Sequence, residues 1–462
     1  MKKCFTVLVW VSLSVWAYAQ PGGEFGAFLC RSNTAAGRYL TAKQQEHAGF
    51  LTRNWQAYSA ISGIEDPFSK RGDAGLPDGE QPQEHSSDSS RDRIVYPKKN
   101  VPDRPLPTGM LGFNFYRRQY QVHYDRKDGF LLEGIGSKDV AAMWDALAAG
   151  PAATLARDCM QIREKEQLCD WAFLQLADSL STAVYPTLPN ERELLFGFLL
   201  GQAGYQVRFG TSGRTLSCLY NTQQIIYAKS FFRGDGNSYW YTHVPGDGAW
   251  SLSDPCPGRP LDLTLTALPA MGGPVRVHHV SSAGVEFDWS ISQALLDFYA
   301  SYPHTEMHIK ADAPVGQAFR EAAYPALKVA LAGKGEVESV NLLLRFVWGV
   351  MTYRTDRQHW GYEKWSFPEE SCFWQVGDCD DHAILFCRLV RDLLGLDALL
   401  VECETERGPH AAAAVRFNEP LEGDTITCGG QLYYCCEPTS NAARAGQRRW
   451  KKYEVTRAER VR

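Results

Sequence analysis

The chain of 462 residues has no marked excess of charge of either sign. Its 48 Lys and Arg residues stand against 53 Asp and Glu residues, which gives a formal net charge of −5 at pH 7. A protein that binds nucleic acid neutralises phosphates with a surplus of Lys and Arg. The balance here excludes such a basic face, and we expect no nucleic-acid partner.

Long apolar runs are also scarce, and the one that is present lies at the start of the chain. Residues 1–19 (MKKCFTVLVWVSLSVWAYA) combine Lys2 and Lys3 with a short apolar stretch and a small-residue ending. This is the pattern of a secretory signal peptide cleaved after residue 19. A membrane-spanning helix needs about 20 apolar residues, and no later stretch has them. We expect an exported protein, periplasmic or secreted, with no membrane span after cleavage.

Cysteine pairs with the C-x-x-C spacing are absent, although the chain has 13 cysteines. Export permits disulfides, but the spacing indicates no pairing, so a disulfide-stapled structural protein is the weakest functional hypothesis. A zinc site would need paired ligands at short spacing or an acid that completes the set. The residues whose spacing lacks this pattern are Cys428, Cys435, Cys436, His278, His279, His304 and His308. We expect no metal and no cofactor.

The chain beyond the signal divides into three sections. Residues 20–107 hold a short amphipathic stretch at 41–62 and then, over 63–107, a linker rich in Pro, Gly, Ser and charge. Residues 108–265 mix helical and strand patterns, which predicts an α/β domain. Residues 266–462 form the last domain, with a core at 310–445. This length is expected to hold two or three packed units.

The periodicity of apolar residues predicts the main elements. Helices are predicted over 138–150, 163–183, 190–205, 313–332 and 336–353. Strands are predicted over 206–212, 215–222, 224–232, 237–244, 397–404, 410–417 and 431–438. Residues 381–396 (DHAILFCRLVRDLLGL) are apolar on almost every side, which is typical of a helix buried in the middle of a domain. Gly395 is its expected left-handed C-cap.

The stretch GDCDDHAIL at 377–385 places Cys379 just before this buried helix. A helix N-terminus favours a thiolate, because its free N–H groups stabilise negative charge. Asp381 is a plausible N-cap. The carboxylates of Asp378, Asp380 and Asp381 oppose the thiolate, so a cationic partner is required. His382, one turn into the helix, is expected to be a packed or surface residue.

The partner is expected to be a histidine with an acid behind it. His410 opens the strand HAAAAVRF, and Glu437 ends the next strand, just before Pro438. A cysteine at a helix start, a histidine at the start of one strand and an acid at the end of the next form a coherent triad. We therefore predict Cys379, His410 and Glu437 as catalytic residues.

These three stretches resemble the core motifs of the transglutaminase-like superfamily, whose thiol catalytic core has a papain-like arrangement. The resemblance covers residues 310–445, and the segment before Cys379 is similar to that of exported transglutaminase-domain proteins of Bacteroidetes. It implies an α+β fold in which the Cys379 helix packs on an antiparallel sheet. It also implies Cys379 as nucleophile, His410 as base, and Glu437 where the family usually has Asp.

The resemblance further implies an oxyanion site made by the Cys379 backbone N–H and an upstream donor. Trp374 and Gln375 are the candidates, and the sequence does not choose between them. A dense aromatic run precedes the motif, and its members belong either to the core or to the wall of a substrate cleft. The run consists of Tyr353, Trp360, Tyr362, Trp365, Phe373 and Trp374.

One internal similarity concerns the 108–265 domain. NERELLFGFLLGQAGYQVRF at 190–209 resembles 381–401, since each has a polar start, an apolar helix, a glycine and a strand. No cysteine precedes the earlier stretch. Two interpretations stay open: a degenerate copy of the transglutaminase-like half, or an ordinary helix–strand unit.

The leading functional hypothesis is an exported thiol-dependent amide hydrolase or acyltransferase that works through an acyl-enzyme. Its substrate would be a peptide, an isopeptide or a peptidoglycan-type amide, with hydrolysis preferred over transfer to an amine. The alternative is a catalytically weak or inactive protein of the same fold that binds a peptide or glycan. Glu437 in place of Asp and the acidic residues around Cys379 favour this alternative.

Overall fold

The computed structural model describes residues 109–462, with gaps at 126–128, 151, 235, 243–250, 254 and 257. The predicted signal peptide, the 41–62 helix and the 63–107 linker lie outside the described residues. Within them the chain is a mixture of helices and antiparallel sheets, with one short parallel strand pair. The α+β class is therefore confirmed. Among the described helices, none is both long and apolar enough to cross a membrane.

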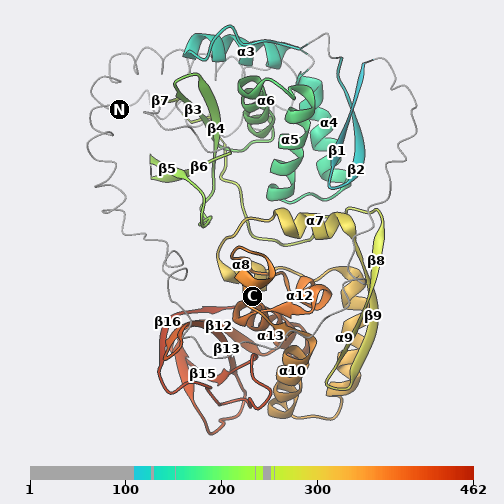
Figure 1. Ribbon diagram of the computed structural model, residues 1–462, viewed down its shortest axis with the longest axis vertical. Helices are drawn as coiled ribbons and strands as arrows, with labels where there is room; N and C mark the ends of the chain where they lie inside the picture. The colour runs from blue at the N-terminus through green and yellow to red at the C-terminus, as the bar shows by residue number, and fades with distance from the viewer. Residues whose placement is uncertain are drawn as a thin grey trace, which may run out of the picture.

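The first group of elements lies at the top of Figure 1 and consists of a hairpin, four helices and a sheet. A hairpin of β1 (Met110–Phe115) and β2 (Arg118–His123) precedes them. The helices are α3 (Ser137–Ala149), α4 (Ala152–Lys165), α5 (Asp170–Val184) and α6 (Pro189–Gln202). The strands that follow are β3 (Val207–Ser212), β4 (Thr215–Asn221), β5 (Phe231–Gly234), β6 (Asn237–Tyr241) and β7 (Ser251–Leu252). They form one antiparallel sheet in the order β5-β6-β4-β3-β7.

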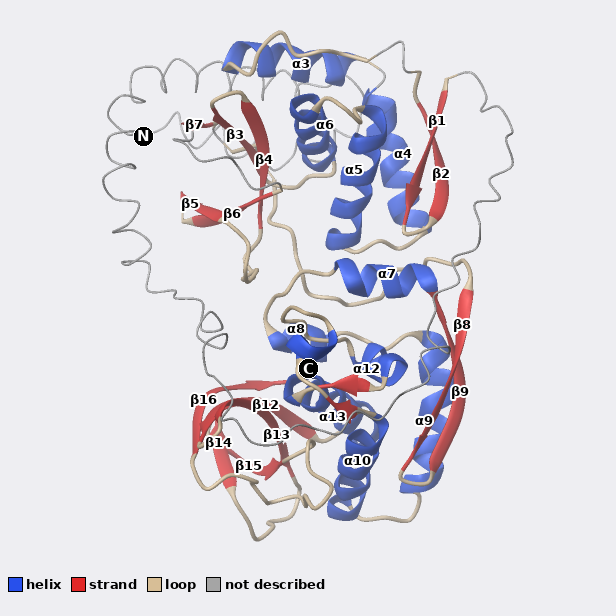
Figure 2. Cartoon of the chain, viewed as in Figure 1, coloured by secondary structure: helices blue, strands red, loops and turns tan. Residues whose placement is uncertain are grey.

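The second group begins with a long hairpin and ends in a second five-stranded sheet (Figure 2). The hairpin is β8 (Val275–Ser282) with β9 (Val285–Ser292). The helices are α7 (Gln293–Ser301), α8 (Met307–Asp312), α9 (Gln317–Leu331), α10 (Glu336–Val350), α11 (Asp356–His359), α12 (Pro368–Trp374) and α13 (Cys379–Leu394). The sheet strands are β12 (Asp397–Thr405), β13 (Gly408–Arg416), β14 (Thr425–Cys428), β15 (Gln431–Cys436) and β16 (Tyr453–Arg460), in the order β14-β15-β13-β12-β16. Two short strands, β10 (Thr352–Tyr353) and β11 (Val376–Gly377), pair in parallel.

The two groups share one continuous apolar core. Hydrogen bonds also join them, because Trp171 Nε1 donates to the Ser301 carbonyl at 3.0 Å and the Tyr227 N–H donates to the His304 carbonyl at 2.8 Å. Apolar side chains buried on both sides of such a contact hold the groups together.

Helix α13 lies between the second sheet and α10. Its residues from Asp380 to Val390 are all buried, as its apolar sequence predicted. Gly395 caps it in the left-handed conformation, with its N–H bonded to the Arg391 carbonyl. On β13 the small residues Ala411 and Ala413 belong to the same core as α13, which allows the helix backbone to approach the sheet closely.

Three predicted elements differ from the structure. The helix predicted over 336–353 ends at Val350, and Thr352 and Tyr353 form the strand β10. The single helix predicted over 163–183 is two helices, because Gln167 adopts a left-handed φ of 49° and the Leu168 N–H bonds back to the Arg163 carbonyl. This is a Schellman-type helix end without its usual glycine, so no residue in the sequence signals it. The strand predicted over 224–232 is formed only from Phe231 onward.

Candidate active site

Cys379 is the first residue of α13. The two residues of β11 lead into it and are held by β10, since Tyr353 lies opposite Gly377 in the strand pair. Asp378 is the N-cap, and its carboxylate accepts a hydrogen bond from the Asp380 N–H at 3.3 Å. The sulfur is therefore placed at a helix N-terminus, where free N–H groups stabilise negative charge.

The N-cap prediction for Asp381 is wrong, because the helix begins two residues earlier than Asp381. Asp381 lies in the first turn instead, is fully buried, and accepts a hydrogen bond from the Ser366 N–H at 2.7 Å. The polar start of the helix thus extends back to Asp378.

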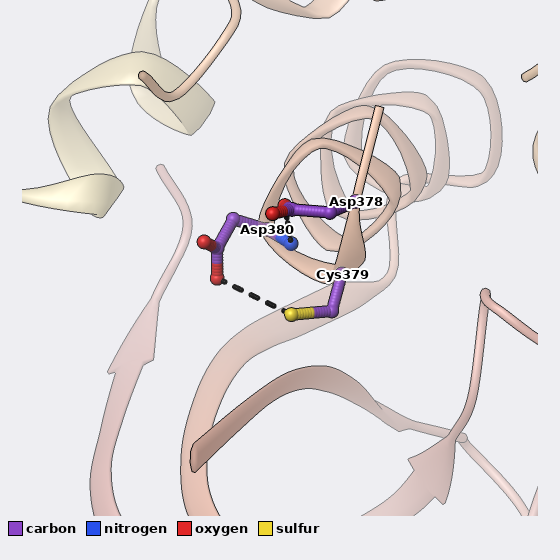
Figure 3. A group of neighbouring side chains, drawn as sticks. All are labelled: Asp378, Cys379 and Asp380. Carbon is purple, nitrogen blue, oxygen red and sulfur yellow. Dashed lines mark hydrogen bonds between the residues drawn. The ribbon is translucent and has the colours of Figure 1, made fainter. Parts of the chain in front are cut away.

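The Cys379 side chain is partly exposed, and its thiol contacts an acid. The thiol donates to Asp380 Oδ1 over 3.8 Å, as Figure 3 shows. The other carboxylate oxygen, Asp380 Oδ2, accepts from Trp365 Nε1 at 3.0 Å, which fixes the carboxylate beside the sulfur. A nearby carboxylate opposes the effect of the helix N-terminus, because it repels a thiolate.

His410 and Glu437, 27 residues apart in sequence, lie in direct contact. His410 Nε2 is 2.8 Å from Glu437 Oε2, and both side chains are buried. His410 lies near the start of β13, and Glu437 directly follows β15. Ala413 lies opposite Cys436, so continuing this register by one residue sets Glu437 opposite Ala412, diagonally across from His410.

The second oxygen of Glu437 is held by Thr439. The Thr439 N–H donates to Glu437 Oε1 at 3.2 Å, and the Thr439 hydroxyl bonds to the same oxygen. Burial raises the pKa of Glu437, but the bonds and charge of His410 and the two donors of Thr439 outweigh it, so the pKa is lowered. Glu437 is therefore built to be ionised against the His410 imidazole.

His382, in the first turn of α13, and Tyr353, on β10, interact electrostatically with members of the predicted triad. His382 is buried in the first turn of α13, and its Nδ1–H donates to the Asp378 carbonyl at 2.5 Å. Burial lowers the pKa of His382 to about 4, with Glu437 opposing this and His410 adding to it. His382 is thus a packed neutral residue within electrostatic reach of the pair.

The Tyr353 ring is 6.0 Å from the His382 ring, centroid to centroid. The pKa of Tyr353 is raised, first by loss of solvent around its hydroxyl and then by negative charge at Cys379, Asp378, Asp380 and Glu437. A single hydroxyl therefore senses both the cysteine and the acid of the predicted triad. The sequence placed Tyr353 only in an aromatic run, and the strand pairing with Gly377 is what brings it to the site.

The two oxyanion candidates have other hydrogen-bond partners. Trp374 Nε1 donates to Glu370 Oε1 at 3.3 Å, and its ring contacts Trp360. Gln375 ends α12 with a left-handed φ of 53°, and its amide donates to the His279 carbonyl at 3.0 Å. Both remain candidates by position, since Trp374 lies five residues and Gln375 four residues before Cys379.

The aromatic run before the motif divides between core and surface. Trp365 and Phe373 are buried, whereas Tyr353 and Tyr362 are 52% and 57% exposed. Some members of the run therefore belong to the core, and the exposed members are the ones available to a ligand.

A group of buried carboxylates that the sequence did not predict adjoins Cys379. Asp356, Asp378 and Asp381 each place an oxygen within 4.8 Å of the others, and one oxygen of each accepts from a backbone N–H. Burial, and repulsion by neighbouring carboxylates, raise all three pKa values. These oxygens, or Asp378, Cys379 and Asp380, are the described atoms close enough to hold a cation.

The other cysteines and histidines show no shared site within the described ranges. All eleven cysteines there are free thiols, so the disulfide-stapled hypothesis finds no bridge in this part of the chain. His279 bonds to Asp288 and His308 to Glu459, while the rings of His278 and His304 contact Phe373 and Trp365 respectively. The histidine pairs are thus separated by their own contacts.

Comparison with known proteins adds no relative. No protein-family model matches the chain, and no curated protein matches it significantly.

Proposed function

We propose that the protein is a thiol-dependent amide hydrolase in which Cys379 is the nucleophile, His410 the base and Glu437 the orienting acid. The observation that carries the proposal is the buried contact between His410 and Glu437, on the sheet that packs against the helix headed by Cys379. A buried acid bonded to one imidazole nitrogen fixes the tautomer and leaves the other nitrogen to accept a thiol proton.

The proposed chemistry runs through an acyl-enzyme. The thiol proton passes to the imidazole, the sulfur attacks the amide carbonyl, and the imidazolium returns the proton to the leaving amine. Water then cleaves the thioester, with the imidazole as base. In this proposal the Cys379 backbone N–H, at the start of α13, stabilises the oxyanion together with an upstream donor. An amine in place of water would make the protein an acyltransferase.

The substrate class that we propose is a peptide, isopeptide or peptidoglycan-type amide. Exposed Tyr353, on the strand that pairs with β11 just before Cys379, supports a ligand with an apolar or ring-containing surface, because aromatic faces bind such groups. The similarity of the Cys, His and acid motifs to the transglutaminase-like superfamily supports the same reaction class, and the signal-like start of the chain supports an extracytoplasmic substrate.

A second candidate is a binding protein of the same fold with little or no turnover. The observation that favours it is the contact of the Cys379 thiol with Asp380, beside three further buried carboxylates. Such surroundings disfavour a thiolate and so weaken the nucleophile.

The experiment that separates the two candidates is trapping of the acyl-enzyme. The full chain and its Cys379→Ala variant are incubated with a panel of peptide amides and a peptide aldehyde, and adducts are mapped by mass spectrometry. The enzyme proposal expects an adduct on Cys379, turnover of an amide, and loss of both in the variant. Equal adduct formation in the variant, or ligand binding without any adduct, contradicts it.

A further inference from the structure

The two five-stranded sheets have the same strand order. Numbered from its own first strand, each sheet runs third, fourth, second, first, fifth across its width. In each, a tight hairpin joins the first two strands, closed by Ser212 opposite Thr215 and by Thr405 opposite Gly408. Every neighbouring pair in both sheets is antiparallel. The tendency of sequential strands to be neighbours accounts for the pairs of first with second and third with fourth strand, but it does not require the fifth strand to lie beside the first in both sheets.

The helices around the sheets also correspond. Helix α6 precedes the first sheet and packs on β3 and β4, as α13 precedes the second and packs on β12 and β13. A long helix packs on each of these, α5 on α6 and α10 on α13. A left-handed glycine follows each buried helix, at Gly204 and Gly395. We infer that residues 170–252 are a second, catalytically silent copy of the architecture that carries Cys379.

The correspondence identifies what the first copy has at the three catalytic positions. The first residue of α6 is Pro189, where α13 has Cys379. His410 is two residues past the closing pair of its hairpin, and the equivalent residue after Thr215 is Ser217. Glu437 lies opposite Ala412, which is four residues past Gly408. The residue four past Thr215 in the first sheet is Leu219, and the residue opposite it is Tyr241. The first copy therefore has no thiol, imidazole or carboxylate at these places.

Packing at these positions is consistent with a silent copy. Ser217 is buried, and Tyr241 belongs with Leu219 and Tyr239 to an apolar cluster on one face of the first sheet. A buried cluster of this kind has no room for a reacting amide.

The first copy also lacks the segment that surrounds the cysteine. Only four residues separate α5 from α6, whereas 28 residues, 351–378, separate α10 from α13. This segment carries Tyr353, Asp356, Trp374 and Asp378. Because the first copy has no such segment, we assign residues 351–378 to the function of the second copy alone. The silence of the first copy depends on the proposed role of Cys379, but the shared architecture does not.

The shared architecture is tested by disulfide trapping in the full chain. Thr211 lies opposite Ser251, and Glu404 opposite Glu454, each pair joining the last strand of a sheet to its first. Directly opposed residues are about 4.5–5.5 Å apart between Cα atoms, within disulfide range. We expect T211C/S251C and E404C/E454C to cross-link on mild oxidation. The control R233C/S251C should not, because β5 and β7 lie at opposite edges, about 19 Å apart.

Mass mapping distinguishes the new cross-link from links among native thiols, and only samples that unfold as cooperatively as the parent are compared. Cross-linking of the control, or of only one of the two matched pairs, overturns the shared order. A crystal structure of the unaltered chain is an equivalent test for any pair that does not fold.

The absence of catalytic activity in the first copy is tested with the Cys379→Ala chain and a fluorophosphonate, which labels reactive serines. We expect no adduct within 189–252 and no residual amide turnover. An adduct on Ser217, or turnover that disappears in the Cys379→Ala/Ser217→Ala double variant, overturns it. If the parent itself shows no turnover, the proposed function fails, while the cross-links still decide whether the architecture is shared.

Discussion

Replacement of Glu437 by Gln is the sharpest perturbation of the proposed triad. The carboxylate receives a hydrogen bond from His410 at 2.8 Å and is only 2% exposed, so its charge is poorly screened by water. Gln keeps the shape and an acceptor oxygen but removes the charge that stabilises an imidazolium. A buried charge-assisted hydrogen bond contributes about 1.5–3 kcal/mol. At about 1.4 kcal/mol per decade, we expect amide turnover or acylation to fall about 10- to 100-fold.

The assay is single-turnover acylation of Cys379 followed by mass spectrometry, with Glu419→Gln as an exposed control. Thermal unfolding checks the fold. Because the pKa of Glu437 is lowered in the folded protein, its ionised form stabilises the fold above the ordinary carboxyl pKa of about 4.3. That stability is lost as pH falls through the lowered value, so the stability difference from Glu437→Gln should shrink in acid. Acylation of the variant at the parent rate would refute the orienting role.

Three further predictions concern the surroundings of the site. Asp356→Asn should raise the unfolding temperature at pH 8, because a carboxyl whose pKa is raised in the folded protein lowers the stability of the fold as pH rises above about 4. Removal of about 1 kcal/mol of this cost should raise the midpoint of a thermal scan by about 2–4 °C, and an unchanged or lower midpoint contradicts the prediction. Asp380→Asn removes the acid beside the sulfur, so the midpoint of iodoacetamide labelling of Cys379 should move to lower pH; an unmoved midpoint would mean that Asp380 does not hold back the thiolate. Ala413→Leu adds volume between β13 and α13 and should destabilise the fold by about 1–3 kcal/mol in urea unfolding, whereas a neutral result would show a looser contact than described.

The sequence was sufficient for the elements that carry the predicted triad. The all-round apolar pattern of 381–396 predicted a buried helix, and the short apolar runs in HAAAAVRF and LYYCC predicted the strands that bring His410 and Glu437 together. These patterns are reliable because each face of a central strand or buried helix must be apolar, whatever else it packs against.

Long-range pairing explains what the sequence could not supply. Tyr353 reaches the site because β10 pairs with β11, two strands of two residues each that carry no alternation signal. Asp356 joins Asp378 and Asp381 through the fold of the loop between them, and acids in a polar loop ordinarily indicate a solvated surface. The shared strand order of the two sheets was visible in sequence only as one helix–glycine–strand similarity, because cross-strand neighbours are far apart in the chain.

The most direct test of the central claim is the relative reactivity of Cys379 among the free thiols. Cys428 is also partly exposed and lies on β14 outside the predicted triad, so it is an internal reference in the same molecule. With iodoacetamide at pH 6.5, we expect Cys379 to react at least about tenfold faster than Cys428 and His410→Ala to remove this advantage, since a thiolate needs the imidazolium. Labelling of Cys379 no faster than Cys428 in the parent chain would contradict it.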